Sequence, residues 1–359
     1  MKNCVESNKN GKVAVLFSGG NDCSLVALKY LKRNYRVDLL HFCHGANISN
    51  NLHRIRYQEL EKVAPERIQL VEISHKGMFR KFSLQDIEVD FAEHKTSMIC
   101  LGCRLAMHVE AIMYCKKNDI KIVADGSVKY QEDFPEQDKE AIRMFRQLYS
   151  SYGIKYETLL SEISSAKQVK YELLDNGISM QSLEDTCLFS NTFSKANKKE
   201  IVSFLTRKMP LAQKYLFERM QMEGVYVIDK IGGVIINDGK VLGLRKKKES
   251  ENSEFIIPGG KREDGETDVD TLIREIKEET NLDVKNNSFL GEYYDMAVFE
   301  NVPIRIRTYI VEVDGELGVQ NEIKEYRWLG KEDINQNVPV GSVLAECVFP
   351  ELLERKMVG

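Results

Sequence analysis

Residues 260–282 read GKREDGETDVDTLIREIKEETNL and form the most informative stretch of this 359-residue sequence. Its apolar residues recur at the spacing of one helix face: Leu272, Ile273 and Ile276. Glu275, Glu278 and Glu279 recur at a similar spacing, which places three carboxylates on another face. Such a cluster repels itself unless cations lie within it, and carboxylate oxygens suit Mg²⁺ or Mn²⁺. The stretch therefore predicts an amphipathic helix with a divalent metal site.

This pattern resembles the Nudix box of nucleoside-diphosphate-linked hydrolases. Gly260 is followed after five residues by Glu266 and, after seven more, by Arg274 and the glutamate cluster. Asn281 stands where the box usually has glycine, but asparagine tolerates the left-handed conformation that is common after a helix. The resemblance covers about residues 230–335. It implies a C-terminal Nudix α/β/α sandwich domain that hydrolyses a diphosphate linkage.

The resemblance also assigns roles to individual residues. The catalytic and metal-binding set that it implies is Arg274, Glu275, Glu278 and Glu279. The three glutamates would bind the metal ions with help from the Gly260 carbonyl, while Arg274 orients them and Glu266 supports the loop. A fourth glutamate often completes such sites, and Glu322 and Glu325 are the candidates. No motif fixes the leaving group, so nucleoside triphosphates, ADP-ribose and dinucleoside substrates all stay open.

The first half of the chain begins with a different pattern. The apolar, β-branched run at residues 13–17 is followed by a glycine pair and then by leucines and a valine at helical spacing, which predicts strand, turn and helix. Further strand-like runs occupy residues 37–42, 68–73 and 120–124. The segments between them are long enough for the crossovers of a parallel sheet. We therefore expect a doubly wound, Rossmann-like α/β domain.

The turn after the first strand has the sequence FSGGNDCS, residues 17–24. A glycine turn that opens a helix exposes backbone N–H groups that favour phosphate. The turn resembles the SGGxDS loop of the PP-loop ATP pyrophosphatases, which cleave ATP to an adenylated substrate and pyrophosphate. The ATP-binding residues that this implies are Ser18, Gly19, Gly20, Asp22, Cys23 and Ser24. Ser18 and Ser24 would donate hydrogen bonds to phosphate, Asp22 would hold Mg²⁺, and Cys23 stands in place of the last serine.

Two further polar segments end predicted strands at the same carboxyl edge, where open α/β sheets bind ligands. The segment His41 to Gly45 follows the second strand, where this fold normally presents the adenine pocket. The segment Asp125 to Ser127 follows a later strand. Both are expected on the side of the sheet that carries the phosphate loop.

The cysteines indicate a metal site of a second kind. Cys100 and Cys103 form a CxxC motif, and Cys187 follows 84 residues later. Three thiolates can hold an iron–sulfur cluster, or Zn²⁺ with His108 or Cys115 as a fourth ligand, and buried thiols without any metal are the third alternative. The arrangement resembles the cluster-bearing tRNA thiolation enzymes. The related 7-cyano-7-deazaguanine synthases share the phosphate loop, but their dense four-cysteine cluster is absent from this sequence.

The chain divides into two parts of opposite charge. Residues 1–222 contain 33 basic and 27 acidic residues, whereas residues 223–359 contain 18 and 28. Helical spacing at 194–222, interrupted by Pro210, predicts helices that close the first domain, and Asn237-Asp238-Gly239 predicts a β-hairpin in the second. We therefore place a PP-loop domain at residues 1–222 and a Nudix domain at residues 223–359.

Together these features predict a bifunctional nucleotide enzyme. The Nudix domain would hydrolyse a nucleoside diphosphate linkage with Mg²⁺, and the PP-loop domain would use ATP to adenylate an acceptor, for sulfur or nitrogen transfer to RNA or a nucleobase. The basic first half suits an RNA acceptor such as tRNA, and a small-molecule acceptor is the alternative. The alternative is a nucleotide sensor whose PP-loop binds ATP without turnover. The sequence has neither an apolar run long enough to span a membrane nor the apolar core of a signal peptide, so we expect a cytoplasmic protein.

Overall fold

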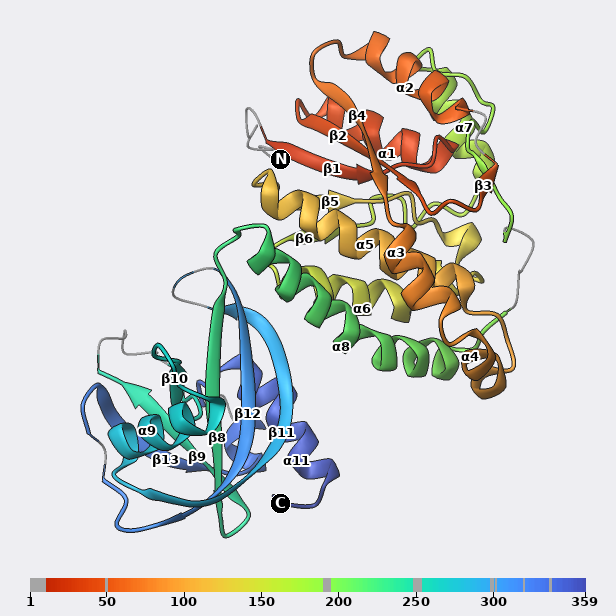
Figure 1. The fold of residues 1–359 in the computed structure, drawn as a ribbon. Coiled ribbons are helices and arrows are strands. Elements are labelled where there is room, and N and C mark those ends of the chain that lie inside the picture. The colour runs from red at the N-terminus through yellow and green to blue at the C-terminus, as the bar shows by residue number, and fades with distance from the viewer. Residues whose placement is uncertain are drawn as a thin grey trace, which may run out of the picture. The chain divides into compact units, whose positions relative to one another are not determined.

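The computed structural model describes residues 11–48, 51–189, 195–247, 254–297, 300, 302–318, 320–335 and 338–359. The chain folds into two compact units, Met1–Val225 and Tyr226–Gly359, which run from red to green and from green to blue in Figure 1. Each unit has its own sheet and its own apolar core. In the described part of the chain, no helix is long and apolar enough to cross a lipid bilayer.

The first unit is built on a parallel sheet of five strands. In spatial order they are β4 (Ile68–Ser74), β2 (Arg36–Cys43), β1 (Lys12–Leu16), β5 (Ile122–Ala124) and β6 (Lys155–Glu157). The order grows outward from β1 in both directions, since β1 pairs with β2 on one side and with β5 on the other. This topology confirms the predicted doubly wound α/β domain. The sequence does not predict β6, because its three residues, KYE, contain no apolar run.

The helices of the first unit form two contacting groups. The first group is α1 (Asn21–Lys32), α2 (Leu52–Val63) and α7 (Ala166–Leu174). The second group is α5 (Ile99–Lys117), α6 (Lys139–Ser150) and α8 (Lys198–Met222). Shorter elements complete the unit: α3 (Lys76–Phe79), η1 (Arg80–Leu84), α4 (Ile87–His94), η2 (Lys129–Gln131) and η3 (Pro135–Gln137). Figure 1 shows the first group on the far side of the sheet from α5 and α8.

Helix α8 runs without interruption through Pro210. The predicted interruption at Pro210 is therefore wrong. A proline inside a helix loses one backbone hydrogen bond and costs about 3 kcal/mol. Apolar residues on both sides of it, such as Leu205 and Leu216, are fully buried, and α8 packs against α5 and α6. This packing outweighs the cost of the proline.

A small antiparallel pairing holds the segment that precedes α8. Strand β3 (Asn47–Ile48) pairs with β7 (Thr186–Cys187). The fully buried Arg56 donates to the carbonyl oxygens of Ser179, at 2.8 Å, and of Gln181. The segment at residues 179–187 is thereby fixed beside the carboxyl end of β2.

The second unit contains a mixed sheet. In spatial order its strands are β11 (Asp283–Ala297), β12 (Val302–Asp314), β8 (Ile228–Asn237), β9 (Lys240–Lys246) and β13 (Ile323–Leu329), with β10 (Gly259–Lys261) also paired to β8. Strands β8 and β12 are parallel and the other pairs are antiparallel. The predicted hairpin joins β8 to β9, and Asp238 and Gly239 in its turn have φ angles of 47° and 71°. Two such residues are what a two-residue hairpin loop needs. Phe255 and Ile256 form isolated bridges, with Val340 and Leu244.

Helical elements cover both faces of this sheet. Leu272 and Ile276 of α9 (Asp268–Thr280) pack on Ile235, whereas its neighbour Val234 belongs to the core cluster of η4 (Val343–Val348) and α11 (Phe349–Glu354). Since successive strand residues point to opposite faces, the unit is the predicted α/β/α sandwich. The apolar face of α9 is narrower than predicted, because Ile273 is 44% exposed. A last short helix, α10, spans Lys331–Asn335.

Candidate functional site

Helix α9 carries the glutamate cluster and is fixed at both ends. Thr267 caps its start, with its hydroxyl accepting from the Asp270 N–H at 3.2 Å and its own N–H donating to the Asp270 carboxylate at 2.9 Å. Asn281 ends the helix with a φ angle of 62°, the left-handed conformation expected there. The cluster therefore lies on a helix whose length and register are set by local sequence.

Arg274 lies among the carboxylates. Its guanidinium makes two bonds to Glu266, at 2.7 and 2.9 Å, and donates to Glu275 at 2.7 Å. It also lies 3.5 Å from the Glu278 carboxylate. Hydrogen bonds from Arg274 lower the pKa of Glu266 to about 2. Arg274 thus holds the loop residue Glu266 and the helix residue Glu275 in fixed positions.

Two glycines bring the backbone of β10 against these carboxylates. The Gly259 N–H donates to the Glu279 carboxylate at 2.8 Å. Gly259 has a φ angle of 147°, and a side chain there would overlap the carbonyl oxygen of Ile231. A side chain at Gly260 would overlap the Glu275 carboxylate. The approach of Glu275 and Glu279 to the backbone therefore requires glycine at both positions.

The three glutamates differ in exposure. Glu279 is only 4% exposed, and burial raises its pKa to about 7. The side chain of Glu275 is 14% exposed and that of Glu278 is 49% exposed. The cluster therefore extends from the interior of the unit to its surface, with Glu278 at the solvent end.

The two candidates for a fourth glutamate lie in different surroundings. Lys246 pairs with Glu322, and its Nζ also lies 3.7 Å from the Glu279 carboxylate. Glu325 pairs instead with Arg245, at 2.7 Å. The structure therefore brings Glu322, rather than Glu325, to the cluster.

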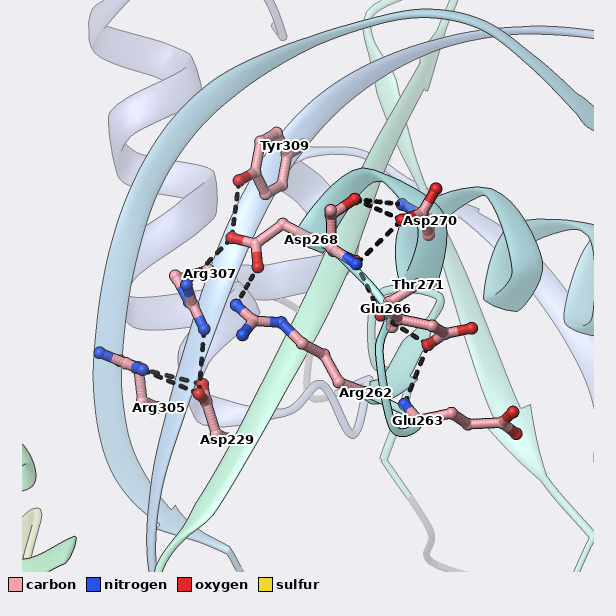
Figure 2. A network of polar contacts seen from close by, with 11 residues as sticks. Asp229, Arg262, Glu263, Glu266, Asp268, Asp270, Thr271, Arg305, Arg307 and Tyr309 are labelled. Atoms are coloured by element: carbon pink, nitrogen blue, oxygen red, sulfur yellow. Dashed lines mark hydrogen bonds and ion pairs between the residues drawn. The ribbon is translucent and has the colours of Figure 1, made fainter.

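A network of charged residues ties the start of α9 to the sheet, as Figure 2 shows. Asp268, in the first turn, pairs with Arg307 at 3.0 Å and accepts a hydrogen bond from the Tyr309 hydroxyl at 2.9 Å. Arg307 and Arg305 both pair with Asp229 on β8, at 3.0 and 2.8 Å. These contacts fix the helix that carries the glutamates to β8 and β12.

A cavity of about 120 Å³ opens beside Gly259. Its walls are mostly apolar: Ile231, Ile257, Ile304, Ile306, Val343 and Leu344. The charged residues Lys230, Glu254 and Glu300 also line it. Binding sites for small molecules combine apolar walls with a few polar groups in this way, although whole ligands need roughly 300–1,000 Å³. The cavity therefore suits one ring of a ligand.

In the first unit, the phosphate loop joins β1 to α1. The N-cap residue of α1 is Gly20, which has no side chain to accept hydrogen bonds from the first backbone N–H groups of the helix. The start of the helix can therefore present these groups to a ligand. Gly19 has a φ angle of 92°, and a side chain there would overlap the carbonyl oxygen of Leu183. A side chain at Gly126 would lie 2.6 Å from the Cys23 amide nitrogen. Glycine at these positions lets the loop pack against the end of β5 and the segment at 179–187.

A cavity of about 430 Å³ lies over this loop. Of the predicted ATP-binding residues, Ser18, Gly20, Asp22 and Cys23 line the cavity. Ser24 does not, because it is fully buried and its hydroxyl donates to the carbonyl oxygen of Gly20. The structure therefore gives Ser24 a part in shaping the loop and directs the other polar side chains to the cavity.

Charged residues from distant segments line the same cavity. The Glu184 carboxylate accepts a hydrogen bond from the Ser18 hydroxyl at 3.2 Å. Burial raises the pKa of Asp22. Arg104 pairs with the fully buried Asp125. Asp125 thus holds the positively charged Arg104 side chain at the cavity.

Among the described residues, the three predicted metal-binding cysteines do not form a group whose donor atoms all lie within 4.8 Å of one another. Burial raises the pKa of the Cys103 thiol, and the neighbouring thiols of Cys100 and Cys187 raise it further. The Cys103 sulfur lies 3.5 Å from His75 Nε2, and the Cys187 sulfur lies 3.4 Å from His44 Nε2. Two histidines therefore accompany the cysteines.

The expected fourth ligands lie elsewhere. His108 is fully buried, with its Nδ1 at 2.9 Å from the Tyr149 hydroxyl, and Cys115 is fully buried in the core. The histidines in contact with the cysteines are His75 and His44. A second set of potential ligands is also present among the described residues: donor atoms of His41, His53 and Asp185 lie within 4.8 Å of one another.

Family models match both units. The NUDIX domain model matches residues 229–347, and the model of the thiamine biosynthesis protein ThiI matches residues 8–132. An ADP-ribose pyrophosphatase from Methanocaldococcus jannaschii is 33% identical over 150 residues, which are 42% of this chain and 80% of that protein. The chain belongs to the Nudix family. It joins an N-terminal PP-loop domain to a C-terminal Nudix domain, as predicted, and these two domains identify a bifunctional nucleotide enzyme.

Solved Nudix proteins resemble part of the chain. The MutT NUDIX hydrolase from Burkholderia pseudomallei is 21% identical, covers 29% of this chain and 83% of its own, and has a TM-score of 0.27. The NUDIX hydrolase from Nitrosomonas europaea is 18% identical, covers 37% of this chain and 93% of its own, and has a TM-score of 0.33.

Sequence reasoning misses two residues at the sites of this Nudix protein. Glu184 lies in a segment without a motif, and the only signal near it is Cys187, three residues further on. His75 directly follows β4, at the sheet edge where open α/β folds bind ligands. That position is a usable signal, of the same kind as the segments that follow β2 and β5.

Proposed function

We propose that the Nudix domain catalyses Mg²⁺-dependent hydrolysis of a nucleoside diphosphate that is linked to a second group. The observation that carries the proposal is the placement of the glutamates: Glu275 and Glu278 lie beside Arg274, and Glu279 accepts a hydrogen bond from the Gly259 N–H. Glu275, Glu278 and Glu279 offer the oxygen ligands that Mg²⁺ prefers. Glu275 lies directly against Gly260, and the Gly260 carbonyl would complete the metal site.

The glutamates would bind the metal from different depths, because their side chains differ in exposure. Glu279 would hold the metal from the interior, and Glu278 would hold it at the surface, where the diphosphate arrives. Bound Mg²⁺ supplies charge neutralisation for the diphosphate and acidifies the attacking water. Arg274 keeps Glu275 oriented, and Glu322 is the fourth carboxylate at the site.

The substrate that we propose first is ADP-ribose. The archaeal relative bears the name ADP-ribose pyrophosphatase, and the apolar cavity beside Gly259 offers space for one ring. Water would add across the diphosphate and give AMP and ribose 5-phosphate. The test is chromatography of the products after incubation with ADP-ribose, nucleoside triphosphates or dinucleoside polyphosphates. Preferred cleavage of ADP-ribose supports this substrate, and cleavage of triphosphates alone would replace it.

We also propose that the PP-loop domain binds ATP and transfers its adenylyl group to an acceptor. The phosphates would lie in the cavity at the start of α1, beside Ser18 and Gly20, and Asp22 would hold Mg²⁺. The acceptor attacks the α-phosphorus, the bond to the bridging oxygen breaks, and pyrophosphate leaves. RNA and a nucleobase are the acceptor classes proposed, with sulfur or nitrogen as the group transferred later.

A second candidate function of this domain is ATP sensing without turnover. The observation that favours it is Glu184, whose carboxylate bonds to Ser18 and lies 3.0 Å from where a side chain at Gly20 would begin. A negative group there opposes the entry of phosphate unless a cation accompanies it. Formation of AMP and pyrophosphate from ATP would exclude the sensing function.

For the cysteines we propose an iron–sulfur cluster or Zn²⁺ at Cys100, Cys103 and Cys187, with His44 or His75 adjacent. We expect protein purified without oxygen to contain either iron with sulfide or zinc at this site. The double variant Cys100→Ala, Cys103→Ala should lose that metal. Iron, sulfide and zinc analysis of both proteins is the measurement. Equal metal content in the two proteins would contradict the site, and iron with sulfide would favour sulfur transfer to an RNA such as tRNA.

The buried Glu279 predicts a pH dependence of stability. Burial raises its pKa from 4.5 to about 7, so the folded domain holds this proton more tightly than the unfolded chain. In the absence of metal, the free energy of unfolding therefore falls as the pH rises from about 4.5 to about 7. The fall is on the order of 3 kcal/mol. Glu279→Gln stays neutral and should remove this loss.

Urea unfolding in EDTA, followed by fluorescence, tests the pH dependence. Trp328 is the single tryptophan and lies on β13, so it reports on the second unit alone. The wild type should lose stability relative to Glu279→Gln between pH 5 and pH 8. Parallel pH profiles for the two proteins would show that Glu279 has an ordinary pKa.

A further inference from the structure

Three polar side chains meet next to the phosphate loop, and the proposed adenylation uses none of them. The rings of His41 and His53 stack with their centroids 3.6 Å apart. Asp185 Oδ2 lies 3.5 Å from His41 Nε2 and 3.4 Å from His53 Nδ1. The side chains are 8%, 2% and 4% exposed, in the same order of residues. They therefore form a compact polar group that is shielded from water.

The outer contacts of the two histidines fix their tautomers. His41 Nδ1 lies 3.2 Å from the carbonyl oxygen of Phe17, which can only accept, so Nδ1 carries the proton. His53 Nε2 lies 3.1 Å from the Glu72 carboxylate and by the same argument is the protonated nitrogen. In the neutral rings, His41 Nε2 and His53 Nδ1 are therefore unprotonated, and each carries a lone pair. Both unprotonated nitrogens face Asp185.

This arrangement leaves three electron-pair donors facing one another. Within the described part of the chain, His53 Nδ1 and Asp185 Oδ1 are buried and have no hydrogen-bond partner. Burying polar atoms without a partner is costly, and the mutual repulsion of lone pairs adds to that cost. A cation between the three side chains would relieve both.

We propose that His41 Nε2, His53 Nδ1 and the Asp185 carboxylate bind one divalent transition-metal ion of the Zn²⁺ type. Two imidazoles and one carboxylate suit Zn²⁺ and Fe²⁺, whereas Mg²⁺ prefers oxygen ligands alone. The outward N–H bonds to Phe17 and Glu72 are the outer contacts that metal-binding histidines usually make. Three protein ligands leave at least one coordination position free.

The site would connect three parts of the first unit. His41 lies on β2 and His53 on α2, while Asp185 belongs to the segment at 179–187. Its neighbour Glu184 lines the ATP cavity, so adjacent carboxylates of one segment serve different sites. A bound ion would thus anchor the segment that supplies Glu184. The site is distinct from the cysteines, which contribute no ligand to it.

The test uses Zn²⁺ and the full-length chain with Cys100→Ala and Cys103→Ala, so that the cysteine site cannot account for the metal. We expect about one Zn²⁺ per chain after dialysis and a higher unfolding temperature with Zn²⁺ than with EDTA. Adding Asp185→Asn should weaken Zn²⁺ binding by about 100-fold or more. The matched control is Asp175→Asn, which removes an exposed carboxylate of the same unit.

Folding of the variants is checked with EDTA present. Because Asp185→Asn removes a carboxylate that faces two lone pairs, the metal-free variant should unfold no more easily than its parent. Cobalt substitution of the Cys100→Ala, Cys103→Ala variant gives an independent reading, because nitrogen and oxygen ligands lack the thiolate-to-metal bands of a cysteine site. Absence of bound Zn²⁺ from the cysteine variant, or equal Zn²⁺ binding after Asp185→Asn, would overturn the proposal.

Discussion

Replacing Glu278 with glutamine should reduce Mg²⁺-dependent diphosphate hydrolysis by about 10³-fold or more. Glutamine preserves the shape of the side chain and removes the charge that binds a cation. Glu278 is the suitable residue to test because its side chain is 49% exposed and its contact with Arg274 is long, at 3.5 Å. The change should therefore spare the fold. The rate of product formation at saturating Mg²⁺ is the measurement.

The control for this experiment is Glu263→Gln, which removes an exposed carboxylate from the neighbouring loop. Its hydrolysis rate should stay within about twofold of the wild type, since surface substitutions rarely disturb a fold. Formation of AMP and pyrophosphate by the PP-loop domain should be unchanged in both variants. Full hydrolysis by Glu278→Gln would contradict the catalytic assignment of the cluster.

The second large effect is expected at the phosphate loop. Asp22→Asn should lower pyrophosphate release from ATP by about 10³-fold, because the proposed Mg²⁺ ligand is lost while the phosphates remain negatively charged. Asp22 accepts a hydrogen bond from the Tyr130 hydroxyl, and asparagine can accept the same bond. Loss of activity would therefore reflect the missing charge. A coupled pyrophosphate assay with the full-length protein is the measurement.

Two comparisons make this result specific. Asp133→Asn removes a carboxylate that is 73% exposed and should leave pyrophosphate release unchanged. Asp22→Asn should leave diphosphate hydrolysis by the Nudix domain at the wild-type rate. If the wild type itself binds ATP and releases no pyrophosphate, the domain is an ATP sensor, and Glu184→Gln becomes the variant that tests why phosphate is bound without turnover.

The features that can be predicted from the sequence are those that short segments determine. The Glu275, Glu278 and Glu279 cluster follows from helical spacing within five residues, and the end of α9 follows from Asn281. The parallel sheet follows from apolar runs and crossover lengths. The Nudix helix, the parallel sheet of the first unit and the hairpin between β8 and β9 therefore agree with prediction.

The features that cannot be predicted depend on contacts between distant segments. Spacing alone does not separate Glu322 from Glu325, since the difference is their pairing with Lys246 or Arg245. Ser24 lies beside a residue that faces the cavity, yet its hydroxyl turns to the Gly20 carbonyl. Such outcomes depend on packing rather than on local pattern.

The arrangement of His41, His53 and Asp185 also depends on contacts between distant segments. His41 and Asp185 are separated by more than a hundred residues in the sequence, and no local motif joins them. They meet because β7 pairs with β3 and because Arg56 binds the backbone of the segment at 179–187. The uninterrupted helix at Pro210 likewise depends on burial by α5 and α6.

The most direct test of the central claim is ³¹P NMR of ADP-ribose incubated with the wild-type protein and Mg²⁺. The two diphosphate resonances should disappear together, and two monophosphate resonances, from AMP and ribose 5-phosphate, should replace them. Removal of Mg²⁺ with EDTA should stop the reaction. Diphosphate resonances that persist at catalytic protein concentration with Mg²⁺ present would contradict the assignment of this Nudix domain as an ADP-ribose hydrolase.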